Sequence, residues 1–288
     1  MTEDIRYQSS DGLNLYAKRY GPRDAQLSVL CMHGLTRNHK DFEPMIAALP
    51  EQYQFIAVDV RGRGLSDRDK NAEHYSPVTY VGDMAALLDH LKLDRVALIG
   101  TSMGGLMSMI MMKAMPQRVR GVVLNDVGPV FETAGLNRIA AYTSNNEPMA
   151  GWDDAARIVG EVQADIFPDY GPEQWMAFAR RTYRELSDGR VALDYDPEIT
   201  RTVSQVRPGL LTRIAMWKLY KEMSKAPLLL IRGETSDILS EKTAAKMIKR
   251  HPDAQLVTVP RVGHAPILDE PEAVQGIRNF LANVEART

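Results

Sequence analysis

Residues 95–115, RVALIGTSMGGLMSMIMMKAM, predict a strand, a tight turn and a helix in immediate succession. The run 96–100 is apolar, as in a strand buried on both faces of a parallel sheet, and 103–115 resembles a buried helix. Gly100 and Gly104 flank Ser102 at the turn, and glycine allows a sharp bend and close approach of neighbouring elements. The turn should therefore lift the Ser102 hydroxyl above the sheet, near the positive end of the helix.

Similar patterns recur along the chain and predict an α/β fold. A hairpin is expected around Ser10, Asp11 and Gly12, because strand-like runs flank these turn residues. Further strand-like runs lie at 27–32, 54–60, 95–100, 121–126, 226–233 and 254–260. Helix-like segments lie at 38–49, 78–92, 103–115, 240–250 and 271–286. This alternation indicates βαβ units around a mostly parallel sheet.

The alternation breaks between residues 128 and 223, where helical patterns appear at 153–166, 172–187 and 211–223 without a strong strand. We therefore predict an α/β core formed by 1–127 and 224–288, interrupted by a helical cap or lid at 128–223. Because the insert follows a strand, it should lie over the carboxyl edge of the sheet, where ligands bind in open α/β folds. A segment at that position can act as a lid.

Composition narrows the classes of partner and the cellular location. The net charge is −2 with no long run of one sign, which argues against a nucleic-acid or membrane-surface partner. Cys31 is the single cysteine, so no internal disulfide can form and a reducing compartment is favoured. Neither a signal peptide nor a membrane-spanning run is evident. We expect a cytoplasmic monomer or homodimer that acts on a small molecule.

The segment 100–104 also fits G-x-S-x-G, the pattern of a nucleophile elbow. A serine hydroxyl is a weak nucleophile until a base takes its proton. Of six histidines, His264 lies in a loop bounded by Gly263 and Pro266, directly after the last predicted strand. That loop opens onto the same sheet edge as Ser102. We predict Ser102 as the nucleophile and His264 as its base.

The imidazole needs a carboxylate that sets its tautomer and stabilises its positive charge. Asp237 follows the strand at 226–233 and gives the chain order Ser, Asp, His expected for such a fold. Asp126, at the end of the strand at 121–126, is the rival acid, although it could instead serve as a turn residue. The sequence favours Asp237.

An oxyanion in such a reaction needs fixed hydrogen-bond donors. The backbone N–H of Met103 follows the nucleophile, and the N–H of Leu35 lies in the loop after the third strand, so both are predicted donors. His33, His39 and Asp41 lack the spacing of a known zinc motif, and no nucleotide-binding motif is present. We therefore predict neither a metal nor a cofactor.

Together these features resemble the α/β-hydrolase superfamily. The resemblance rests on His33-Gly34, the segment DVRGRGLS at 59–66, the elbow at 100–104, Asp237 and His264, and so spans residues 33–266. It implies a mostly parallel eight-stranded sheet with an antiparallel second strand, helices on both faces and a lid after the sixth strand. It also implies a mainly structural role for 59–66. Dehalogenases and epoxide hydrolases of this fold carry Asp at the elbow, and the serine at position 102 argues against both chemistries.

A narrower resemblance concerns the segments GLTRN at 34–38, LNDVGP at 124–129 and RGETSDILS at 232–240. They are similar to a bacterial subgroup of lidded, esterase-like hydrolases, some of which cleave simple esters and aliphatic polyesters. We therefore expect a serine hydrolase that cleaves carboxylic esters of small to medium acyl groups through an acyl-enzyme. The same triad could instead cleave a carbon–carbon bond in a ring-fission product, or serve a ligand receptor that hydrolyses slowly.

Overall fold

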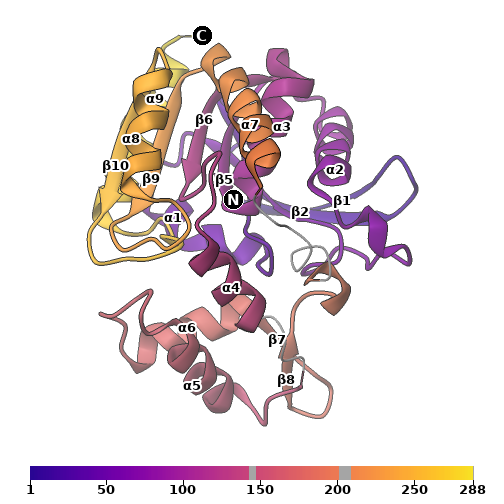
Figure 1. The fold of residues 1–288 in the computed structure, drawn as a ribbon. Helices are drawn as coiled ribbons and strands as arrows, with labels where there is room; N and C mark the ends of the chain where they lie inside the picture. Colours follow the sequence, from indigo (N-terminus) through magenta and orange to yellow (C-terminus); the bar gives the residue numbers. More distant parts are fainter. Residues whose placement is uncertain (143–146, 201–208, 288) are drawn as a thin grey trace.

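The computed structural model describes residues 1–142, 147–200 and 209–287, and its centre is an eight-stranded sheet (Figure 1). In spatial order the strands are β1 (Thr2–Gln8), β2 (Asn14–Tyr20), β4 (Gln54–Asp59), β3 (Ser28–Met32), β5 (Val96–Thr101), β6 (Val119–Asn125), β9 (Leu228–Gly233) and β10 (Ala254–Val259). Strand β2 runs antiparallel to both neighbours, and the other pairs are parallel. The predicted sheet is confirmed.

Helices cover both faces of this sheet, which explains why its central strands are apolar throughout. In β3, Leu30 and Met32 join one core cluster, whereas Val29 and Cys31 join the other, because successive side chains point to opposite faces. The first cluster includes buried residues of α2 (Pro77–His90), α3 (Met103–Ala114) and α8 (Glu241–Arg250). The second includes residues of α1 (Glu43–Ala48) and α9 (Pro271–Glu285).

The segment between β6 and β9 differs from the all-helical prediction. It contains α4 (Thr133–Tyr142), α5 (Trp152–Gln163), α6 (Pro172–Thr182), β7 (Tyr183–Glu185), β8 (Val191–Leu193) and α7 (Leu210–Lys221). Helix α6 ends five residues before the predicted limit of 187, because the chain turns into the antiparallel β7–β8 hairpin. Three-residue strands are too short to show a clear period in sequence. The predicted insert, 128–223, also includes 143–146 and 201–208, which lie outside the described residues.

This inserted segment packs in two places. Helices α5 and α6 share a small core of their own, in which Phe167, Trp175 and Phe178 contact one another. Figure 1 shows α5, α6 and the β7–β8 hairpin grouped beyond one end of the sheet, at the foot of the view. In contrast, Trp217 and Tyr220 of α7 pack with the main core beside α3.

Parallel pairing brings the carboxyl ends of six strands to one edge, and each predicted site residue follows one of those ends. Leu35 follows β3, Ser102 follows β5, Asp126 follows β6, Asp237 follows β9 and His264 follows β10. This edge therefore carries the candidate site. Within the described residues, no helix has both the length and the apolar character needed to cross a bilayer.

Candidate active site

Ser102 occupies the strained turn that the two glycines predicted. Its backbone lies at φ 51° and ψ −108°, and its N–H donates to the carbonyl of Asn125 at 3.0 Å. A Cβ atom on Gly104 would lie 1.9 Å from the Met32 carbonyl oxygen, so only glycine lets α3 approach β3 this closely. A non-glycine residue at positive φ is strained, and such strain is often found at functional sites.

His264 connects Ser102 to a buried carboxylate. Its Nε2 lies 3.0 Å from Ser102 Oγ, and its Nδ1 lies 2.8 Å from Asp126 Oδ2. A carboxylate only accepts hydrogen bonds, so Nδ1 carries the proton and Nε2 is left to accept one from the serine hydroxyl. The Asp126 side chain is fully buried and that of His264 is 7% exposed. The arrangement can remove a proton from Ser102 and stabilise the imidazolium that results.

The rest of the Asp126 carboxylate is held by the turn after β9. Its Oδ1 accepts from Gly233 N at 3.0 Å, and its Oδ2 also accepts from Ser236 Oγ at 2.6 Å. Asn125 donates from Nδ2 to the Pro266 carbonyl at 2.7 Å and so anchors the loop that carries His264. These contacts hold the carboxylate and the imidazole in one fixed relation.

The structure corrects the choice of acid, because Asp237 does not pair with His264. Its two carboxylate oxygens accept from Nε and Nη2 of Arg138, on α4, at 2.7 and 2.8 Å. Burial raises the pKa of Asp237, but the hydrogen bonds and charge of Arg138 outweigh burial and lower that pKa overall. Asp237 thus joins the loop after β9 to the inserted segment.

Chain order could not separate the two acids, because both lie between Ser102 and His264. Position in the sheet does separate them. Asp126 directly follows β6, which is hydrogen-bonded to β5, whereas Asp237 lies four residues beyond the last residue of β9. The sequence alone held no decisive signal for this choice, because it does not specify which strand lies beside the elbow strand.

The loop after β3 and the start of α3 both present backbone N–H groups near Ser102. Within the described part of the chain, neither Leu35 N–H nor Met103 N–H has a hydrogen-bond acceptor, and both residues line the cavity above the serine. Two such groups beside a nucleophile can stabilise negative charge on a carbonyl oxygen. The geometry is compatible with the predicted pair of donors.

His33 positions the Leu35 N–H, a role not predicted from the sequence. Its Nε2 lies 3.1 Å from Val60 N, which can only donate, so its Nδ1 carries the proton that bonds Gly34 O at 2.6 Å. Burial lowers the pKa of His33 to about 4, which keeps it neutral at pH 7. Carbonyl and N–H point in opposite directions across a trans peptide, so this bond directs Leu35 N–H away from His33.

A cavity of about 530 Å³ opens above Ser102 and His264. Most of its lining is apolar, and it includes Phe131, Leu136, Ile158, Val159 and Phe167 from the inserted segment. Arg37 at its wall pairs with Asp41 and lies over the Phe178 ring, with its guanidinium carbon 4.2 Å from the ring centre. The volume falls within the range of small-molecule sites.

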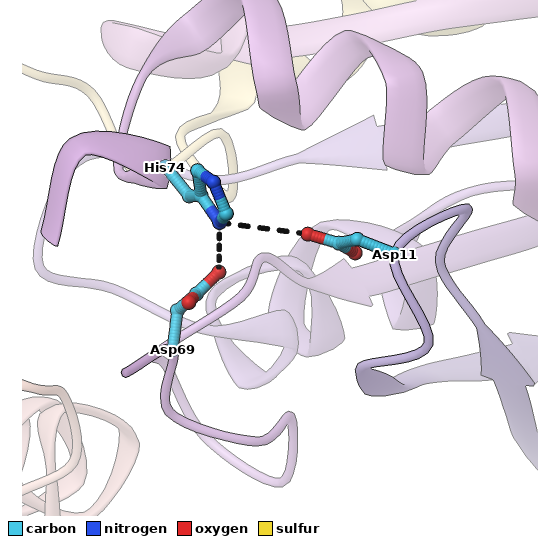
Figure 2. A group of neighbouring side chains, drawn as sticks. All are labelled: Asp11, Asp69 and His74. Carbon is cyan, nitrogen blue, oxygen red and sulfur yellow. Dashed lines mark hydrogen bonds and ion pairs between the residues drawn. The ribbon is translucent and has the colours of Figure 1, made fainter. Parts of the chain in front are cut away.

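A second cluster of potential ligands lies away from this cavity. His74 Nδ1 lies 2.9 Å from Asp69 Oδ2 and 3.6 Å from Asp11 Oδ2 (Figure 2). Arg61 Nη1 contacts the same two carboxylate oxygens at 2.6 and 2.9 Å, and Arg61 also binds Asp83. Because a guanidinium already neutralises these oxygens, the group is best described as an ion-pair network that joins the β1–β2 turn to the segment after β4.

Comparison with known proteins assigns the chain to a family. The model of the alpha/beta hydrolase family matches residues 29–275, which include every group of the site described above. The chain belongs to this family. It is a hydrolase, as are the similar proteins described next.

The chain is 33% identical over 251 residues to a 3-hydroxybutyrate-oligomer hydrolase of Cupriavidus necator, a match that covers 85% of each protein. It is 29% identical to a 2-(acetamidomethylene)succinate hydrolase of Mesorhizobium japonicum over 93% of this chain and 91% of the relative. A crystal structure of an alpha/beta hydrolase from Novosphingobium aromaticivorans superposes with a TM-score of 0.90 at 40% identity, covering 100% of this chain and 99% of that one.

Proposed function

We propose that this hydrolase cleaves carboxylic esters of small to medium acyl groups by nucleophilic catalysis, with Ser102, His264 and Asp126 as its triad. The observation that carries the proposal is the pair of contacts at His264, 3.0 Å to the serine hydroxyl and 2.8 Å to a buried carboxylate. Both distances lie within hydrogen-bond reach, the requirement for a base that activates a nucleophile.

The reaction proceeds in two steps. Ser102 Oγ attacks the ester carbonyl while His264 Nε2 takes the hydroxyl proton, and the imidazolium then protonates the departing alcohol. Water, activated by the same nitrogen, attacks the acyl-enzyme and releases the acid. In both steps the carbonyl oxygen becomes an oxyanion, to which Leu35 N–H and Met103 N–H donate.

The cavity and one relative support an ester substrate with an apolar portion. The apolar lining and the volume of about 530 Å³ suit an acyl or alcohol group of several carbons. A similar protein is named for the hydrolysis of 3-hydroxybutyrate oligomers, whose units are joined by ester bonds. We further propose that the insert, 128–223, acts as a lid, since several of its side chains line the cavity, and that the enzyme works in the cytoplasm.

The test is a panel of p-nitrophenyl esters of two to twelve carbons, assayed with the wild type and with Ser102→Ala. We expect kcat/KM to peak at an intermediate chain length, and the variant to lose at least about a thousandfold in kcat. A fluorophosphonate should label the wild type at Ser102 and leave the variant unlabelled. Ester turnover retained by Ser102→Ala, or rapid cleavage of a vinylogous diketone with no ester turnover, would contradict the proposal.

A further inference from the structure

Arg63 is a buried cation with no carboxylate partner among the described residues. It is 1% exposed, and none of the described carboxylates forms an ion pair with it. The neighbouring Arg61, equally buried, contacts the carboxylates of Asp11, Asp69 and Asp83. Burying a charge is expensive unless another charge compensates it, so a buried guanidinium held by neutral groups requires an explanation.

The contacts of Arg63 lead to the oxyanion donors. Its Nε donates to the carbonyl of Leu35 at 2.9 Å, and its Nη2 lies 3.6 Å from Met103 Sδ. Its Nη1 donates to the Arg61 carbonyl at 2.8 Å and to the Tyr80 hydroxyl at 3.0 Å. The guanidinium carbon lies 5.0 Å from the centre of the Tyr80 ring and 5.8 Å from that of Tyr75. One side chain therefore touches both residues whose N–H groups should bind the oxyanion.

These contacts complete the support of the Leu35 loop. The peptide before Leu35 is held by His33, which donates to Gly34 O, and the peptide after it is held by Arg63, which binds Leu35 O. A donor must lie within a few tenths of an ångström of its working position to be effective. Fixing both peptides limits rotation of the Leu35 N–H before substrate arrives.

We propose that Arg63 is a positioning residue for the oxyanion donors and that its charge is compensated by the oxyanion that forms during the reaction. This inference rests on the function proposed above. Because Arg63 is buried, its field acts through the protein interior rather than through bulk water, and no described carboxylate neutralises it at contact distance. At an effective dielectric constant of about 20, a cation within roughly 6–10 Å of a developing negative charge accelerates a reaction on the order of 10- to 100-fold.

The experiment compares Arg63→Gln and Arg63→Lys on one good p-nitrophenyl ester. We expect R63Q to lose about 50-fold in kcat with KM within twofold of the wild type, because the effect belongs to the transition state. R63K keeps the charge but shortens the reach to Leu35 O, and should lose about three- to tenfold. A boronic acid that forms a tetrahedral adduct with Ser102 should weaken in parallel with kcat/KM, whereas an uncleaved ether analogue should bind all three proteins equally.

Arg118→Gln is the matched control, because Arg118 also donates to a backbone carbonyl, that of Leu93, but lies outside the cavity lining. It should keep the wild-type kcat. The proposal is overturned if folded R63Q stays within threefold of the wild type in kcat, or if R63K loses as much as R63Q. If R63Q does not fold, a larger change in KM than in kcat for R63K refutes it. The proposed function fails separately, through Ser102→Ala or the substrate panel.

Discussion

Replacing Asp126 by Asn separates the two candidate acids most sharply. The side chain keeps its shape but loses the charge that faces His264 Nδ1 at 2.8 Å. A carboxylate and an imidazolium with charge centres about 4 Å apart, at an effective dielectric constant of about 20, attract by about 4 kcal/mol, or a thousandfold in rate. If the new amide donates to Nδ1, Nε2 carries the proton and cannot accept one from Ser102. The combined loss in kcat should be on the order of 10⁴.

Asp237→Asn is the matched variant. Asp237 is paired with Arg138 and its side chain is 28% exposed, so its loss should change kcat by less than about threefold. The assay is kcat and KM on p-nitrophenyl butyrate for both variants, with thermal unfolding to verify that each is folded. The reasoning is refuted if Asp237→Asn loses as much activity as Asp126→Asn, or if Asp126→Asn keeps a tenth of the wild-type kcat.

Three further substitutions test the surroundings of the site. Burial lowers the pKa of His33 in the folded protein to about 4. Between about pH 4 and 6.5 the unfolded chain therefore binds more protons at this residue than the folded protein does, and the free energy of unfolding rises with pH. His33→Gln should reduce this rise, measured as the free energy of urea unfolding at several pH values, and should lower kcat about tenfold. A pH dependence of unfolding equal to that of the wild type would contradict this prediction. The Glu270 carboxylate accepts hydrogen bonds from Ile267 N and Leu268 N, and burial raises its pKa to about 7. Between about pH 4.5 and 7 the folded protein therefore binds more protons at Glu270 than the unfolded chain does, so the free energy of unfolding falls as pH rises. Glu270→Gln should remove this decrease, and the prediction is wrong if the free energy of unfolding depends on pH as it does in the wild type. Gly104→Ala should destabilise the fold by about 3 kcal/mol or more, because its Cβ would meet Met32 O; a wild-type urea midpoint would show that α3 can shift.

Most of the α/β core follows from local patterns. Runs such as 96–100 and 228–231 are apolar on both faces, and only a sheet covered by helices on both sides buries them fully. The elbow is equally local, because Gly100, Ser102 and Gly104 must all lie within one turn. His264 could be found because a loop after a parallel strand reaches the same edge as the elbow.

The β7–β8 hairpin could not be predicted in the same way. The hairpin has three residues in each strand, and its turn depends on Gly189 at φ 83° and on a bond from Leu186 N to Arg190 O. Such short elements lack a periodic signal and are stabilised by packing with neighbours. Their existence is a property of the folded chain rather than of its local sequence.

The sequence by itself identified the strands and the turn that exposes Ser102, since each depends on residues adjacent in the chain. It also identified His264, because its loop directly follows the last strand. Only the tertiary structure decided that Asp126 rather than Asp237 binds His264, and that Arg63 binds the carbonyl of Leu35. Both decisions depend on which strands are neighbours and on which side chain reaches a carboxylate or carbonyl first. Those distances arise from the packing of segments far apart in sequence, and the order of residues along the chain does not specify them.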